Sequence, residues 1–251
     1  PQDFKRIGEK IGLEAGEPAS WRKAANAMYI PYDEALGIHP QDDSFLDRKP
    51  WDFRHVPKKD YPLLLHYHPL VIYRHGVCKQ ADLVLALYLL GNRFSHQQKK
   101  RDYDFYEPLT THDSSLSTSI FCIMACELGY REKAVGYFER TARLDLDDHN
   151  GNTADGVHLA NMAGTWLSIV AGFGGMRMQD GILYFAPFLP KGWNGYSFHV
   201  TFQGAQLKVS VDQSNVVYRL LSGSAVSFRH GSVGVTLTQK RAKRVFPMAD
   251  R

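Results

Sequence analysis

The densest group of side chains suited to chemistry lies between residues 110 and 117, with the sequence TTHDSSLS. A helix is predicted to begin directly after it, because apolar residues recur at helical spacing from Leu116 to Leu128. Hydroxyl groups and unpaired backbone N–H groups would meet where the helix dipole is positive, which favours an anion. His112 would add a donor or a positive charge. The alternative is that Asp113 or Ser114 is simply the N-cap.

A second candidate is the segment RHGVCKQ at 74–80, which precedes an almost entirely apolar stretch. Lys79, Gln80 and Asp82 are the polar residues that open this predicted helix. Lysine and glutamine are good hydrogen-bond donors to sugar hydroxyls. The segment therefore either faces a polar cavity or is a solvated helix start.

The third candidate is the acidic run LDLDDHNGNTADGVH at 144–158. Its aspartates and asparagines resemble a calcium loop, but the glycine and terminal glutamate of an EF-hand are missing at the required spacing. We therefore expect turn chemistry rather than a metal. His158, which precedes a small-residue helix, would either cap that helix or point into the same cavity as His112.

Aromatic residues and histidines interrupted by prolines fill 61–73, YPLLLHYHPLVIY. We expect a loop or short strand here, suited to stacking on a sugar ring, with core packing as the alternative. The chain has no GxGxxG, GxxxxGK[ST], GxSxG or HExxH motif, so an anion site would not be a nucleotide P-loop.

Helical spacing dominates up to about Phe173. Helices are predicted over 21–28, 80–90, 116–128, 131–144 and 157–173, together with a polar, exposed helix that a capping box opens at Ser95. The helix over 80–90 is apolar on nearly every side. The one over 157–173 carries alanines and glycines that allow close backbone contact, so both should lie inside a larger assembly.

After Met178 the apolar period changes to two. Short strands are predicted around 196–202, 207–211, 226–228 and 233–237, with turns between them, which is typical of an antiparallel β-sandwich. The connection between the two parts is expected as a hinge over 174–192.

The 251 residues have a net charge of +4 and 44% apolar residues, enough for a sizeable core. The basic cluster at 240–244 is expected to be a solvated tail, with nucleic-acid contact as the alternative. Three cysteines without a CxxC spacing favour a reducing compartment, and we expect a cytoplasmic protein. No apolar run is long enough for a membrane span, and no leader is recognisable. The opening at Pro1 suggests a piece of a longer protein.

Several stretches together resemble glycoside hydrolase family 65, which includes maltose, kojibiose, nigerose and trehalose phosphorylases. They are YRHGVCKQADLVLALYLLG (73–91), YDFYEPLTTHDSSLS (103–117), the run over 127–166, GFGGMR (172–177) and, more loosely, IPYDE (30–34). The resemblance covers the helical part, whereas the strand-rich part matches in character more than in letters.

The resemblance implies a mainly α plus all-β fold, with residues 1–175 as the C-terminal part of an (α/α)6 barrel and 176–251 as an antiparallel β-sandwich. It implies that Lys79 and Gln80 bind the transferred glucose. The phosphate ligands that it implies are His112, Ser114, Ser115 and His158. The general acid, a glutamate, would lie upstream, so no catalytic residue is assigned here. Neither a metal nor a cofactor is expected, and inorganic phosphate is a co-substrate.

The leading hypothesis is inverting phosphorolysis of an α-linked glucose disaccharide to β-glucose 1-phosphate and glucose. Phosphate replaces the water and base of an inverting hydrolase, and neutral donors hold it without reducing its nucleophilicity. Kojibiose is favoured because the segment from Tyr61 to His75 is most similar to that branch. The alternatives are a trehalase-like hydrolase and a non-catalytic structural or carbohydrate-binding fragment. The expected partners are the sugar, phosphate and the remainder of the protein, without nucleic acid or membrane; a homodimer stays open.

Overall fold

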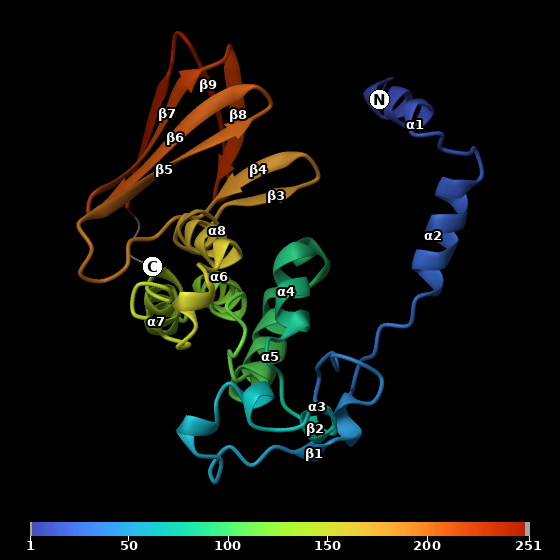
Figure 1. Cartoon of the computed structure of the whole chain (residues 1–251). Helices are drawn as coiled ribbons and strands as arrows, with labels where there is room; N and C mark the ends of the chain where they lie inside the picture. Colours follow the sequence, from blue (N-terminus) through green and yellow to red (C-terminus); the bar gives the residue numbers. More distant parts are fainter. Residues whose placement is uncertain (1, 249–251) are drawn as a thin grey trace.

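The computed structural model describes residues 2–248, and it consists of a helical part followed by a β-sandwich (Figure 1). This confirms the predicted fold class. The α-helices are α1 (Gln2–Lys10), α2 (Glu17–Ala27), α3 (Pro69–Tyr73), α4 (Asp82–Leu89), α5 (His96–Tyr106), α6 (Ser117–Leu128), α7 (Arg131–Ala142) and α8 (Leu159–Leu167). A π-helical segment, η7 (Ser168–Phe173), continues α8 directly.

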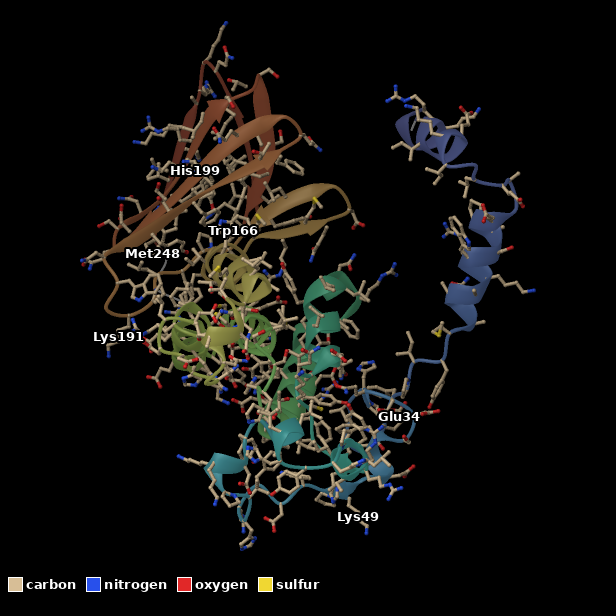
Figure 2. The ribbon with its side chains drawn as sticks, in the orientation of Figure 1. Glu34, Lys49, Trp166, Lys191, His199 and Met248 are labelled. Atoms are coloured by element: carbon tan, nitrogen blue, oxygen red, sulfur yellow. The ribbon has the colours of Figure 1, made fainter. Side chains whose placement is uncertain are left out.

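Helices α1 and α2 stand away from the rest of the molecule (Figure 1). The predicted helix over 21–28 is present as part of α2, and none of its residues is buried. Trp21 of α2 is 57% exposed, which is unusual for so large an apolar side chain. Figure 2 shows the side chains of α2 standing apart from the densely packed side chains of the other part of the molecule.

Helix α6 is the centre of the helical part, with α4, α7, α8 and η7 packed around it. Gly129 ends it, as predicted, in a left-handed conformation with φ 81° that glycine adopts without strain. Burial of α6 extends beyond the apolar face that the sequence predicts. Its first three residues, Ser117, Thr118 and Ser119, are also buried, because neighbouring helices cover every side.

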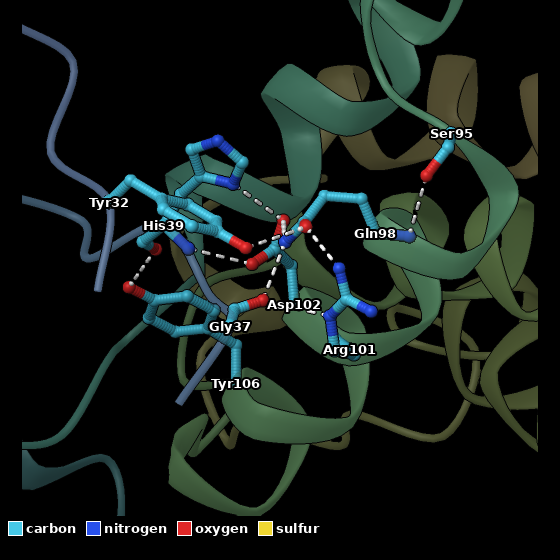
Figure 3. A network of polar contacts seen from close by, with 8 residues as sticks. All are labelled: Tyr32, Gly37, His39, Ser95, Gln98, Arg101, Asp102 and Tyr106. Carbon is cyan, nitrogen blue, oxygen red and sulfur yellow. Dashed lines mark hydrogen bonds and ion pairs between the residues drawn. The ribbon is translucent and has the colours of Figure 1, made fainter. Parts of the chain in front are cut away.

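Helix α5 begins with the predicted cap, in which the Ser95 hydroxyl accepts a hydrogen bond from the Gln98 N–H at 3.1 Å. The prediction that α5 is exposed is wrong, because its polar side chains find partners in the interior. Asp102 is fully buried and accepts two hydrogen bonds from His39 (Figure 3). Lys99 pairs with Glu127 at 2.5 Å.

Small residues let α8 and η7 approach α6 closely, as the sequence predicts. A Cβ atom added to Gly164 would lie 2.6 Å from the Ser119 hydroxyl oxygen. One added to Gly172 would lie 3.3 Å from the Cys126 sulfur. A side chain at Gly164 would therefore force a shift, whereas one at Gly172 would require only a small adjustment of its neighbour.

The sandwich consists of two four-stranded sheets, ordered β10-β7-β6-β5 and β3-β4-β8-β9. Its strands are β3 (Arg177–Gln179), β4 (Ile182–Phe185), β5 (Gly195–Phe202), β6 (Ala205–Asp212), β7 (Asn215–Ser222), β8 (Ala225–His230), β9 (Val233–Thr238) and β10 (Lys243–Pro247). All neighbours are antiparallel except β4 and β8. Alternate residues of the strands from β4 to β9 face a shared core, which explains the period of two.

The segment over 174–192, expected as a hinge, instead contains β3 and β4, and Phe185 of β4 is buried in the sandwich core. The basic cluster at 240–244 is not a free tail, because Lys243 and Arg244 pair with β7 as part of β10. The helical part is joined to the sandwich by ion pairs as well: Glu127 of α6 lies 2.7 Å from Arg177 of β3.

Charge is unevenly distributed between the two parts. Residues 1–175 contain 20 Lys or Arg and 23 Asp or Glu. Residues 176–251 contain ten Lys or Arg and only three Asp or Glu. On one sheet, the basic side chains His199, Lys208, Arg219 and Lys243 stand directly opposite one another in successive strands. Like charges in such positions repel each other.

Among the helices of residues 2–248, none combines the length and apolarity needed to cross a membrane.

Candidate functional site

One hollow of about 460 Å³ gathers most of the predicted phosphate and sugar ligands. Lys79, the serine pair Ser114 and Ser115, and His158 each lie a few residues before a different helix, namely α4, α6 and α8. The remaining lining residues are Pro62, Leu65, Asp113, Leu116, Asn150, Gly151, Asn152 and Asp155. The segments thus bring a cation, two hydroxyls and an imidazole to one place.

The serine pair forms the turn that leads into α6. The Ser114 hydroxyl accepts the Leu116 N–H at 3.3 Å, and the Ser117 N–H donates to the Ser114 carbonyl at 3.1 Å. Within residues 2–248, the side chains of Ser115 and Lys79 make no hydrogen bond or ion pair. Both groups are therefore free to donate to a ligand in the hollow.

His112 is placed differently from its neighbours, because its side chain is buried beneath the serine turn. Its backbone is left-handed, with φ 57°, which turns the ring inward. The Nδ1 atom lies 2.8 Å from the Ser117 hydroxyl, and the ring packs edge-on against Phe121. Burial, with a smaller effect of the nearby Arg140, lowers the pKa of His112 to about 4. The imidazole is thus neutral at neutral pH and does not line the hollow.

Asp113 anchors the opposite wall rather than capping α6. Its carboxylate accepts the Leu63 N–H at 2.7 Å. This bond fixes the segment that supplies Pro62 and Leu65 to the hollow. Because Asp113 and Asp155 add negative charge to the lining, an anion would depend on Lys79, the hydroxyls and the helix N-terminus to offset them.

The segment 61–73 packs with part of its residues, and two others, Pro62 and Leu65, line the hollow. It forms a loop with a 3₁₀ turn (Leu63–Leu65) and the short helix α3, and no strand. Leu63 is buried in a small cluster with Trp51, whereas Leu65 is 76% exposed at the hollow. One side of the segment is packed, and the other contributes apolar surface to the hollow.

His158 is held by Asp145. The two carboxylate oxygens of Asp145 accept from the His158 ring Nδ1 at 2.6 Å and from its backbone N–H at 2.9 Å. These bonds lower the pKa of Asp145 below its usual value, the ring contact contributing most. The rest of the acidic run makes turns, as expected: Asp148 accepts from the backbone and hydroxyl of Thr153 at 2.9 and 2.7 Å.

Gln80 diverges from Lys79 and lines a neighbouring hollow of about 220 Å³ between α4, α6 and α8. Its amide donates to the Asp82 carboxylate at 3.2 Å. Leu116 borders both hollows. The two residues therefore face adjoining spaces, the second of which is mainly apolar.

Sequence reasoning did not find the role of Asp145 or the lining residues Asn150, Asn152 and Asp155. Their only signal was the density of Asp and Asn before His158, which indicated turns. Within residues 2–248, no group of three or more His, Cys, Asp or Glu side chains is arranged to hold a metal ion. All three cysteines are free thiols.

Comparison with known protein families identifies matches over both parts of the chain. Residues 2–167 match the glycosyl hydrolase family 65 central catalytic domain, and residues 176–237 match the C-terminal domain of the same family. The chain belongs to glycoside hydrolase family 65. This confirms the resemblance drawn from the KQAD and THDSSLS stretches.

Three relatives illustrate the range of the family. The chain is 46% identical to an alpha,alpha-trehalose phosphorylase of Thermoanaerobacter brockii, over 97% of this chain and 31% of that protein. It is 40% identical to a maltose phosphorylase of Bacillus subtilis, over 94% of this chain and 31% of that protein. It is 35% identical to a kojibiose phosphorylase of Halothermothrix orenii, over 92% of this chain and 30% of that protein.

A solved structure agrees with the fold. A human-microbiome protein, provisionally named a kojibiose phosphorylase, superposes with a TM-score of 0.86 at 33% identity, covering 98% of this chain and 36% of that one. The family 65 chain described here therefore spans about a third of the length of the relatives that it matches.

Proposed function

We propose that this chain is part of a family 65 enzyme that cleaves an α-linked glucose disaccharide with inorganic phosphate and inverts the anomeric configuration. The observation that carries the proposal is the hollow in which Lys79, Ser114, Ser115 and His158 converge. An oxygen of phosphate would attack the anomeric carbon as the glycosidic C–O bond breaks. A general acid outside this chain would protonate the departing sugar oxygen.

The hollow suits an anionic nucleophile better than a hydrolytic water. Hydroxyls, backbone N–H groups and one ammonium group can orient phosphate while leaving its charge available for attack. We propose that Ser115 and Lys79 contact phosphate directly, and that Gln80 faces the sugar from the adjoining hollow. His112 acts from beneath, by holding the serine turn through Ser117.

The identity of the disaccharide is a finer proposal. The segment from Tyr61 to His75 favours kojibiose, but the trehalose phosphorylase is more similar to this chain than the kojibiose phosphorylase is, at 46% against 35% identity. We therefore place trehalose first and kojibiose second. Rates on trehalose, kojibiose, maltose and nigerose, measured side by side in the full-length enzyme, decide between them.

The phosphate site is tested by replacing Ser114 and Ser115 with alanine in the full-length enzyme. The KM for phosphate should rise by at least about tenfold while the KM for the disaccharide changes little, because two hydroxyl donors are lost only at the anion. Ser222→Ala, on an exposed strand end, is the matched control. An unchanged phosphate dependence would remove the proposal, and full turnover in phosphate-free buffer would favour a trehalase-like hydrolase instead.

A further inference from the structure

A single pairing pattern between an aspartate and a histidine is found three times within residues 2–248. In each case one carboxylate oxygen of the aspartate is bonded to the histidine ring Nδ1, and the other oxygen accepts the backbone N–H of the same histidine. The pairs are Asp145 with His158, Asp102 with His39, and Asp52 with His55. The Asp102 pair lies inside the buried network of Figure 3, and the Asp52 pair is on the surface. Among the three, only His158 borders the hollow.

The pairing determines which ring nitrogen of His158 carries hydrogen. A carboxylate has acceptors only, so the Nδ1 atom, 2.6 Å from Asp145, must be the donor. The second bond, from the His158 backbone N–H at 2.9 Å, fixes the residue relative to the same carboxylate. The Nε2 atom is then the ring nitrogen left for a ligand in the hollow.

We propose that Asp145 is a positioning residue for phosphate: it holds the His158 ring in the Nδ1–H form, so that the unprotonated Nε2 faces the hollow and accepts the O–H of bound hydrogen phosphate. The inference rests on the proposed function, since it assigns a role to a residue of the same hollow. The side chains of Asp145 and His158 are 12% and 23% exposed, so the pair is largely shielded while the ring still reaches the lining.

Asparagine at position 145 gives a specific test because both partners of the carboxylate are donors. The asparagine amide has a single oxygen acceptor. The backbone N–H of His158 can only donate, so this N–H must take the amide oxygen as its acceptor. The amide NH₂ group must then face Nδ1, which becomes an acceptor. Asp145→Asn thus keeps both hydrogen bonds and the shape of the site, but moves the ring hydrogen to Nε2.

The experiment measures KM for phosphate and for the disaccharide in four variants of the full-length enzyme: Asp145→Asn, His158→Gln, their double variant, and Asp52→Asn. Asp52→Asn makes the same change in the same pairing on the surface. We expect Asp145→Asn to raise the phosphate KM by at least about tenfold, because an Nε2 atom that carries hydrogen can no longer accept the O–H of hydrogen phosphate. The disaccharide KM and the melting temperature should stay close to the wild-type values.

The double variant separates positioning from general structural damage. If Asp145 acts through His158, Asp145→Asn adds nothing to the phosphate KM once His158 is glutamine. Additive effects, or a wild-type phosphate KM in either Asp145→Asn or His158→Gln, overturn the inference while phosphorolysis by the wild type still stands. A wild-type enzyme that does not consume phosphate refutes the proposed function, and this inference with it.

Discussion

The carboxylate of Asp113 accepts the backbone N–H of Leu63 at 2.7 Å, joining two segments that are 50 residues apart in the sequence. The serine turn and the apolar wall of the hollow are therefore one connected structure. A residue that the sequence suggested as a helix cap instead holds a distant loop against the site.

Removing this bond should loosen the wall. In Asp113→Ala, the N–H of Leu63 loses a charged acceptor, and we expect the enzyme to lose about 1.5 kcal/mol of stability. Hydrogen exchange should accelerate at Leu63 and the following two amides, which can be read peptide by peptide. Asp43→Ala, an exposed aspartate, is the control. Unaltered protection at Leu63 would show that the loop is held by packing alone.

The buried His112 gives a pH dependence of stability. Its pKa is about 4 in the folded chain against an ordinary value of 6.5, so the unfolded chain binds a proton first. The stability that His112 contributes is complete above pH 6.5 and is lost as the pH falls towards 4. His112→Asn, which tolerates the left-handed backbone, should flatten urea-unfolding free energies over this range. The exposed His66→Asn should retain the wild-type slope.

The contact between the two parts depends on Glu127, which lies between Lys99 and Arg177 at 2.5 and 2.7 Å. Burial alone would raise the pKa of Glu127, but Arg177 and Lys99 together lower it below its usual value. Glu127→Gln leaves two shielded cations facing each other, and should cost about 3 kcal/mol of unfolding free energy. The same substitution at the exposed Glu132 should cost almost nothing. Equal melting temperatures for the two variants would show that the ion pairs of Glu127 do not stabilise the contact between the two parts.

The row of cations across the sandwich leads to a stabilising substitution. Lys208 lies between His199 and Arg219 on neighbouring strands. Lys208→Glu would convert the repulsion between positions 208 and 219 into attraction, and should raise stability by about 0.5 kcal/mol at low salt, less at high salt. Lys191→Glu makes the same charge change in an exposed loop and serves as the control. A salt-independent effect of Lys208→Glu would rule out the electrostatic explanation.

Periodicity predicted most of the elements because each one buries a single kind of surface. In β6, for example, the buried Val209 and Val211 alternate with the polar Lys208 and Ser210, as expected. The exposure of α5 was predicted wrongly, since a sequence pattern cannot reveal that Asp102 and Lys99 meet distant partners in the interior. The strands β3 and β4 are too short to give a period of their own.

The candidate site was predicted in its parts rather than in its geometry. Ser114, Ser115 and His158 do converge, because each lies before a helix of the same packed group. The inward turn of His112 depends on a positive φ angle that its residue type does not dictate. Lys79 and Gln80 are neighbours in sequence but line different hollows, which their residue types do not reveal.

Packing at Gly164, in the interior of the helical part, affects the position of α8 and therefore of His158 at the hollow. The missing side chain lets α8 lie directly on Ser119, and His158 immediately precedes the first residue of α8. A single methyl group at Gly164 would displace α8 as a rigid rod and draw the imidazole away from the serine turn. A packing defect in Gly164→Ala would then be detected as weaker affinity for phosphate, with every residue that lines the hollow unchanged.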